Sequence, residues 1–417
     1  MIKKLKKYIS QSKDRKALVS NFSYLMLLQV TSYAFPLLTI PYLAHVIGVD
    51  GFGKIAFASA MIVWFQTITE WGFNYTATRD AARNRDNIEK ISVIFSNVFW
   101  AKLLLALISF IVLFFLSCTI PYLKEHQNLI LITFLLIPGR VLFPDWLFQA
   151  MEKMRFITIF DLISKAVFTL LIFIFIHQPS DYILQPLFLS LGTLCVGFFA
   201  MYIIIVRWGI KLVAPQWSEI LNTLKNSKDV FINNIMPNLY NSFSSVLLGF
   251  LGGSSANGLL DAGAKFVSIS QQFTNVISRV FFPFLARHSD KHHIYQKLHL
   301  LSSVILSIGL FLFAPLIIKI FFTPEFHQAV IVLRIMAFSL IFLSLSNIYG
   351  VNYMVIHGYE KQLRNITIKA SILGFFVACP LVYFYSYLGA AITITLTRAL
   401  LGFGIMYKAK TIQRSLP

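Results

Sequence analysis

We single out ten charged side chains that lie within stretches of this sequence that are otherwise apolar and long enough to cross a bilayer. The basic ones are Lys102, Arg140, Lys165, Lys265, Arg334 and Arg398, and the acidic ones are Glu70, Asp145, Asp161 and Asp261. A charge inside a membrane costs several kcal/mol unless it contacts protein or water, so such residues are candidates for a functional role. Because this set is net basic, it favours an anionic substrate over a cationic one.

The basic residues are spread over several depths of their predicted spans. Lys265 and Arg334 each lie about eight residues, or about 12 Å, from the outer ends of their spans. Lys102 and Arg398 lie near the middle, and Arg140 lies in the cytoplasmic half. A phosphate group crossing a membrane would need cations at successive depths, where Arg binds it bidentately and Lys acts as a point charge. We therefore predict that these five residues line a substrate path.

Some of these cations have a purely structural alternative. Asp261 and Lys265 are four residues apart, as are Asp161 and Lys165, so each pair lies on one helix face and could be a self-contained ion pair. Lys102 could extend its ammonium group towards the membrane surface. Both explanations stay open at this point.

Three acidic residues are candidates for binding a coupling ion or for a structural role. Glu70 has no obvious partner nearby in the sequence, so it could bind a proton or a sodium ion. Asp145 follows two prolines, Pro138 and Pro144, which interrupt the helix and free backbone groups that need partners. Asp261 is the third candidate.

Other kinds of chemistry are not indicated. The sequence contains no nucleotide-binding loop, no nucleophile elbow and no HExxH motif. A group of histidines fits no zinc-binding spacing, and we expect its members, His288, His292, His293 and His299, to be solvated. We therefore predict no metal, no cofactor and no enzymatic activity. An ion gradient then remains as the driving force, unless the protein only equilibrates its substrate.

The composition indicates an integral membrane protein. Of 417 residues 57% are hydrophobic and only 13% are charged, whereas soluble domains carry about 25% charged residues. A spanning helix needs roughly 20 apolar residues. Twelve such segments are predicted, at 18–46, 53–78, 91–118, 127–149, 156–177, 182–206, 228–251, 257–285, 298–322, 326–355, 363–385 and 389–407.

The distribution of Lys and Arg predicts the orientation of these spans. Every second connection is rich in basic residues, while the intervening connections contain only Lys54, Lys124 and Lys319. Membrane proteins keep Lys and Arg on the cytoplasmic side, so both termini are predicted to be cytoplasmic. The net charge of +19 is thereby explained by the lipid bilayer rather than by a nucleic-acid partner. The basic N-terminus is interpreted as preceding a retained first span, because no cleavage site follows it.

The chain looks duplicated, which predicts an all-α fold of two pseudo-symmetric six-helix lobes. Each half places a Gly-rich external hairpin, near Gly48 and near Gly252, between its first and second spans. Six spans per half give both halves the same topology, as in parallel repeats. The predicted parts are a basic N-terminus (1–17), an N-terminal lobe (18–206), a cytoplasmic linker (207–227), a C-terminal lobe (228–407) and a cytoplasmic C-terminus (408–417).

Three segments carry a resemblance to a known family. Glu70–Asp80, Phe143–Met154 and the hairpin Gly48–Lys54 resemble the O-antigen and polysaccharide flippases of the multidrug/oligosaccharidyl-lipid/polysaccharide (MOP) exporter superfamily. The resemblance extends over nearly the whole chain, and Ala150 departs from it where such proteins usually have Gly.

The resemblance implies a function and a location. It implies a bacterial inner-membrane flippase that moves an undecaprenyl-diphosphate-linked sugar repeat unit to the periplasmic leaflet by alternating access. Proton or sodium coupling and contact with the polysaccharide polymerase machinery are expected. In such folds the first two helices of each lobe line a cationic cavity, which favours Glu70, Asp261 and Lys265 over Lys165.

Other functions are compatible with parts of the pattern. A lipid II flippase, a capsular or teichuronic exporter or a multidrug antiporter belongs to the same superfamily, although an exporter of cationic drugs should have an acidic interior. A repeat-unit polymerase should carry a large, basic external loop, whereas the external connections here are short. In a non-transporting scaffold, all buried charges should be paired.

Overall fold

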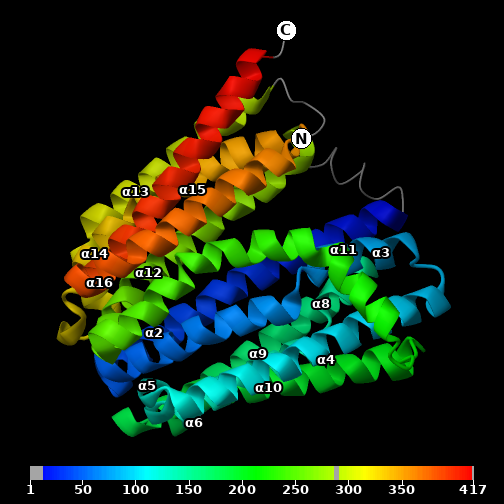
Figure 1. Ribbon diagram of the computed structural model, residues 1–417, viewed down its shortest axis with the longest axis horizontal. Helices are drawn as coiled ribbons and strands as arrows, with labels where there is room; N and C mark the ends of the chain where they lie inside the picture. Colours follow the sequence, from blue (N-terminus) through cyan, green and yellow to red (C-terminus); the bar gives the residue numbers. More distant parts are fainter. Residues whose placement is uncertain (1–12, 286–290, 416–417) are drawn as a thin grey trace. The chain divides into compact units, whose positions relative to one another are not determined.

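The structure is a computed structural model that describes residues 13–285 and 291–415. All regular structure in these ranges is helical (Figure 1). In the first half the helices are α2 Lys13–Glu70, α3 Phe73–Arg83, α4 Ile88–Thr119, α5 Pro121–Glu125, α6 Gln127–Phe134, α7 Leu136–Leu142, α8 Asp145–Ala150, α9 Met154–Phe175, η1 Pro179–Ile183, α10 Leu184–Tyr202 and η2 Ile203–Arg207. The second half contains α11 Trp217–Ile235, η3 Met236–Leu239, α12 Ser242–Leu285, α13 His292–Phe321, η5 Pro324–Phe326, α14 Ala329–Ala337, α15 Ser339–Leu345, η6 Ser346–Val355 and α16 Glu360–Ser415.

Within the described residues, nine helical stretches are long and apolar enough to cross a membrane. Three of them are interrupted by one non-helical residue, Gly48 with φ 64°, Gly253 with φ 78° or Ser386 with φ 50°. Each interruption falls in a connection that the sequence predicts between two spans. A positive φ breaks the helix at that residue, and glycine adopts it without steric cost. The nine stretches therefore hold twelve spans, which confirms the predicted polytopic all-α fold.

The described chain divides into two compact units. The first contains residues 13–42 and 65–232, and the second contains residues 43–64 and 233–415. Residues 43–64, which we call the Gly48 hairpin, therefore belong to the second unit although they include the adjoining ends of the first two spans. Helix α11 begins at Trp217, inside the predicted linker, and continues into the second unit.

Aromatic residues from three helices form the core at one end of the first unit. Phe73 of α3, Phe95 of α4 and both Trp146 and Phe148 of α8 are at most 1% exposed. Helix α8 is short because Pro144 separates it from α7, as the sequence predicted. The aromatic residues of the Phe143–Met154 motif thus hold the broken fourth span in place.

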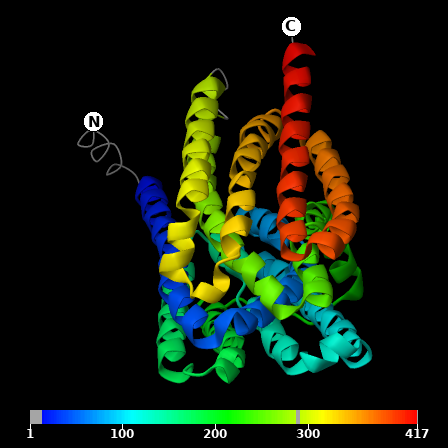
Figure 2. The same ribbon diagram turned by 90° about the vertical axis from the view of Figure 1, so that its left-hand side faces the viewer.

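Glycines bring the two hairpins of the second unit into close contact. A Cβ atom on Gly53 would collide with the carbonyl oxygen of Ser254, and one on Gly258 would collide with the carbonyl oxygen of Val49. Only glycine permits such an approach between backbones. Helices α12 and α16 pack along each other in the same unit, where the chain is coloured from green to red (Figure 2).

Large apolar side chains are exposed along single faces of the spans. On α13 they include Leu301, Ile305 and Leu312, each 60–61% exposed. Their spacing of four and seven residues places them on one face. Such a face suits contact with acyl chains, as expected for a membrane-spanning helix.

The structure corrects one sequence prediction about the histidines. His299 is fully buried rather than solvated, with Nδ1 2.8 Å from Ser344 Oγ and Nε2 3.2 Å from the carbonyl oxygen of Thr274. Hydrogen bonds to neighbouring helices satisfy both ring nitrogens, which makes burial of the ring tolerable. His292 also contacts a carbonyl oxygen, that of Ile348, at 3.0 Å, and His288 lies outside the described residues.

Candidate functional site

A buried ion pair joins two spans of the first unit. Lys102 Nζ of α4 lies 3.0 Å from Glu70 Oε2 at the end of α2, and the lysine is only 2% exposed. The sequence offered Glu70 no nearby partner, because its partner is 32 residues away on another helix. The ammonium group of Lys102 therefore does not extend to the membrane surface but is balanced inside the protein.

The backbone directly after Glu70 is strained and firmly held. Trp71 has φ 44° and Gly72 has φ 80°, so the helix stops at Glu70 and α3 starts after the break. The Trp71 ring stacks on Phe231 at 3.9 Å, and its Nε1 donates to the carbonyl oxygen of Leu224 at 3.0 Å. A non-glycine residue at positive φ costs about 1–3 kcal/mol and is found most often at functional sites.

Two further predicted residues lie near this ion pair. Asp145 is the first residue of α8, accepts a hydrogen bond from its neighbour Trp146 N at 2.8 Å, and interacts electrostatically with Glu70, Lys102 and Arg140. Arg140, on α7, is exposed. The structure thus brings four of the eight predicted site residues together. We call these four, Glu70, Lys102, Arg140 and Asp145, the Glu70 cluster.

The predicted i,i+4 pairs both form. Lys265 Nζ lies 3.1 Å from Asp261 Oδ2 on α12, and Lys165 Nζ lies 2.6 Å from Asp161 Oδ2 on α9. The Lys265 side chain is 40% exposed, against 25% for Lys165. Lys265 Nζ also lies 5.8 Å from the ring centroid of Phe52 on the Gly48 hairpin. The Asp261–Lys265 pair therefore lies beside the contact between the two hairpins.

Arg398 is buried without a carboxylate partner among the described residues. On α16 it is 9% exposed; Nη1 donates to Ser339 Oγ at 2.9 Å and Nη2 to Asn241 Oδ1 at 3.3 Å. Its Nε is buried and has no hydrogen-bond partner in the described part of the chain. The sequence analysis missed Ser339 and Asn241, because neutral polar residues within a span are common and carry no charge signal.

Arg334 lies apart from the other predicted cations. Its Nε donates to the carbonyl oxygen of Phe311 at 3.3 Å, and its guanidinium carbon lies 5.4 Å from the Phe311 ring centroid. It lines a cavity of about 720 Å³ together with Lys319 and His327. No ion pair or hydrogen bond found in the described residues links Arg334, Lys265 and Arg398 to one another.

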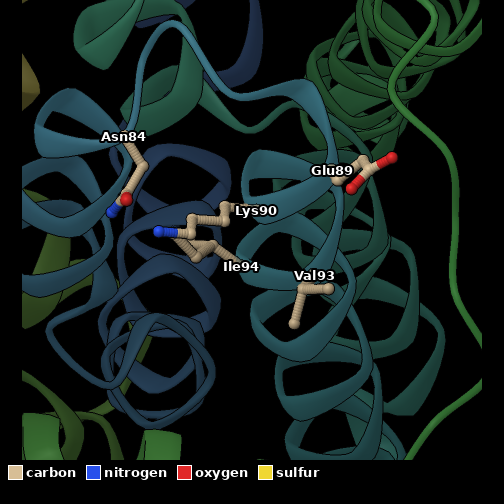
Figure 3. Close-up of a pocket in the computed structure, with 5 residues that line it drawn as sticks. All are labelled: Asn84, Glu89, Lys90, Val93 and Ile94. Atoms are coloured by element: carbon tan, nitrogen blue, oxygen red, sulfur yellow. The ribbon is translucent and has the colours of Figure 1, made fainter.

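A smaller cavity of about 350 Å³ lies where α3 meets α4 (Figure 3). Lys90 points towards Asn84 across this cavity, whereas Glu89 points away from it on the other side of α4. Its lining includes none of the predicted site residues.

Comparisons with known proteins agree with the sequence resemblance. The family model described as "Polysaccharide biosynthesis protein" matches residues 18–289. A protein of Escherichia coli K12 named "Putative O-antigen transporter" is 31% identical over 93% of this chain and 95% of its own length. A protein of Shigella dysenteriae with the same name is 27% identical over 94% of this chain and 99% of its own length.

Solved structures show the same fold. The lipid II flippase MurJ superimposes with a TM-score of 0.74 at 14% identity, covering 94% of this chain and 87% of that one. An inward-facing multidrug transporter of the MOP superfamily gives a TM-score of 0.66 at 11% identity, covering 92% and 96%. These likenesses establish the architecture, and the match of the family model together with the 31% identity shows that this chain belongs to the polysaccharide biosynthesis protein family of membrane transporters.

Proposed function

We propose that this protein is a flippase for a lipid-linked sugar repeat unit. It moves an undecaprenyl-diphosphate-linked O-antigen unit, or a unit of a related surface polysaccharide, from the cytoplasmic to the periplasmic leaflet of a bacterial inner membrane. The observation that carries this proposal is the match of a relative named for O-antigen transport over 93% of the chain. In this proposal the protein acts as a transporter and not as an enzyme, and it hands its substrate to the polymerase machinery.

The proposed orientation places both termini in the cytoplasm. It rests on the alternation of basic and nearly cation-free connections along the sequence. An even number of spans returns the C-terminus to the side of the N-terminus. In this orientation, the hairpins at Gly48 and Gly253 are periplasmic and the first part of helix α11, up to residue 227, is cytoplasmic.

The cations serve the diphosphate in two different ways. Lys265 and Arg140 have exposed side chains, so they can contact a phosphate directly. Arg398 is buried, but a charge in a medium of low dielectric constant is weakly screened, so it attracts an anion from beneath the surface. The absence of a carboxylate partner for Arg398 in the described residues supports this role, because a scaffold would be expected to pair its buried charges.

The Glu70 cluster provides a means of coupling to protons. Protonation of Glu70 would remove its attraction for Lys102 and leave a buried ammonium group without its partner. A nearby anionic diphosphate would then stabilise that ammonium. Proton and anion therefore promote each other's binding, because such a coupling is reciprocal. Asp145, and Asp261 in the second unit, are further candidates for the coupled ion.

Complementation of a deletion strain tests the function. The strain would express single variants, and surface polysaccharide and the leaflet location of lipid-linked repeat units would be measured together with protein levels. Lys265→Ala and Arg140→Ala should be produced normally, yet repeat units should accumulate on the cytoplasmic side. Lys165→Ala is the matched control, because Lys165 forms the same i,i+4 pair and should leave transport intact.

One result would overturn the proposal. If the deletion strain still moves repeat units to the periplasmic leaflet but does not polymerise them, the protein is the polymerase or a helper of it. Normal transport by every basic variant would instead contradict the proposed role of the cations, while the flippase assignment would still stand.

A further inference from the structure

A cavity lined by basic residues lies beside the connection between α13 and α14. It has a volume of about 720 Å³, and its lining includes Lys319, Thr323, His327 and Arg334 on one hand and Ile318 and Phe322 on the other. The cavity belongs entirely to the second unit. It thus combines a polar, basic part with an apolar wall.

The two cations of this cavity are not balanced by acids. Lys54, which belongs to another connection predicted to be external, forms an ion pair with Asp50 at 2.8 Å. Neither Lys319 nor Arg334 forms an ion pair in the described residues, and Arg334 only donates Nε to the carbonyl oxygen of Phe311. The connections predicted to be external contain very few Lys or Arg residues. Two unpaired cations at one cavity near such a connection therefore indicate that the cavity binds an anion.

A hydroxyl group in the cavity also lacks a partner. Thr323 Oγ1 is buried and makes no hydrogen bond within the described residues, although Thr323 lines the cavity. A buried hydroxyl without a partner is unfavourable, and a ligand that accepts its hydrogen would remove this cost. A phosphate oxygen between Lys319 and Arg334 would be such an acceptor.

The surroundings of the cavity are those of a lipid-facing surface. Ile331 and Phe338 lie three residues before and four residues after Arg334, so all three side chains share one face of α14 and its C-cap. Ile331 is 48% exposed and Phe338 is 47% exposed. On α13, Leu316 and Ile320 are 53% and 62% exposed. Because α13 ends at Phe321 and α14 begins at Ala329, the cavity lies at the ends of two proposed spans, where acyl chains would meet head groups. An occupant should therefore have both an anionic head and an apolar tail.

We propose that this cavity binds an anionic glycerophospholipid of the surrounding membrane. Its phosphate lies between Lys319 and Arg334 and accepts the hydrogen of the Thr323 hydroxyl, and one acyl chain lies against Ile318 and Phe322. In the orientation proposed above, the lipid comes from the periplasmic leaflet.

The bound lipid would stabilise the contact of the Gly48 hairpin with the rest of the second unit. Phe322, part of the cavity wall, packs edge-on against Phe52 of the hairpin at 5.8 Å between ring centroids. Glu325, in the same connection, accepts a hydrogen bond from the backbone nitrogen of Val49 at 3.3 Å. Occupancy of the cavity thus fixes the connection that holds the hairpin.

Lipid binding to the purified full chain tests this inference. Native mass spectrometry would measure the affinity for dioleoyl phosphatidylglycerol, with zwitterionic dioleoyl phosphatidylcholine for comparison. The wild type should prefer phosphatidylglycerol, and the double variant Lys319→Gln, Arg334→Gln should bind it about tenfold more weakly. Lys124→Gln, which removes an external cation outside the cavity, is the matched control and should bind like the wild type.

Three results would overturn the inference. These are equal binding of both phospholipids by the wild type, unchanged binding by the double variant, and displacement of phosphatidylglycerol from the cavity by undecaprenyl phosphate, which would assign the cavity to the transported lipid. If the double variant does not fold, Thr323→Val keeps the shape and should still weaken binding about threefold. None of these measurements uses a transport assay, so they leave the proposed function to its own test.

Discussion

Among the described residues, each unit contains one deeply buried cation, and the two are balanced in different ways. Lys102, 2% exposed, pairs with the carboxylate of Glu70 at 3.0 Å. Arg398, 9% exposed, has no carboxylate partner among the described residues, and its partners include the hydroxyl of Ser339 and the side-chain oxygen of Asn241. A carboxylate neutralises a charge, whereas hydroxyl and amide groups only solvate it.

This difference determines which of the two sites can change its net charge. A carboxylate can be neutralised by a bound proton or cation, so the charge balance around Lys102 can change. An Arg side chain keeps its proton under all ordinary conditions, so the charge of Arg398 is permanent. We infer that the first unit carries the ion-sensitive element and that the second carries a fixed attraction for anions.

Removal of Glu70 should have the largest effect on stability. Glu70→Ala leaves the ammonium of Lys102 buried without its partner, and breaking a buried ion pair costs about 3–5 kcal/mol. We expect about 3 kcal/mol, because Glu70 keeps 21% of its side chain exposed and Asp145 also faces the cluster. Chemical denaturation of the purified protein in detergent measures the change in the free energy of unfolding.

The double variant Glu70→Ala, Lys102→Met is the control. It removes both charges, and replacing a buried pair by apolar groups is often neutral. Most of the lost stability should therefore return. A double variant that is as unstable as Glu70→Ala would show that the loss comes from packing around Glu70 and not from the unpaired charge.

In the second unit, loss of a neutral partner should cost less. Ser339→Ala removes the hydrogen bond that Arg398 Nη1 donates at 2.9 Å, and a hydrogen bond to a charged group contributes about 1.5–3 kcal/mol. We expect about 2 kcal/mol from the same denaturation experiment.

Arg398→Met separates stability from transport. It removes a buried charge that has no carboxylate partner in the described residues, so the free energy of unfolding should stay the same or rise. Flipping of repeat units in the complemented strain should nevertheless fall. Normal flipping by this variant would contradict the fixed attraction that we infer for Arg398.

The pattern of apolar segments and charges was sufficient to predict the fold. The spans follow from hydropathy. The three residues that interrupt the long helices, Gly48, Gly253 and Ser386, fall in predicted connections. The local ion pair of Asp261 and Lys265 was also predictable, because its spacing of four residues is fixed by helix geometry. Features that depend only on local helix geometry can therefore be predicted from a single sequence.

Contacts between distant helices could not be predicted in this way. Glu70 and Lys102 lie on different spans, and only the packing of α2 against α4 brings them together. The burial of His299 and the partners of Arg398 depend likewise on which helix faces meet. The break after Glu70 left a weak signal, the Trp71–Gly72 pair, because glycine tolerates the positive φ found there.

Anion binding should sharpen the comparison between the units. Glu70→Gln removes the negative charge that balances Lys102 at 3.0 Å, so the affinity for an anion should rise. We expect the purified Glu70→Gln variant to bind undecaprenyl diphosphate about tenfold more tightly than the wild type. An unchanged affinity in Glu70→Gln would move the coupling site elsewhere, with Asp145 as the next candidate.

The smallest effect on stability concerns the two i,i+4 pairs, which are chemically alike. Lys165→Ala and Lys265→Ala should each cost only about 0.3–0.5 kcal/mol, since both pairs are partly exposed on a single helix. Their effects on flipping should differ, because Lys265 is 40% exposed and lies beside the Phe52 ring of the Gly48 hairpin, whereas the Lys165 side chain is only 25% exposed. Flipping that is lost with Lys265→Ala and kept with Lys165→Ala would show that one pair serves transport and the other only its helix. Equal flipping by both variants would make Asp261–Lys265 a structural pair and leave Arg398 as the main fixed cation of the second unit.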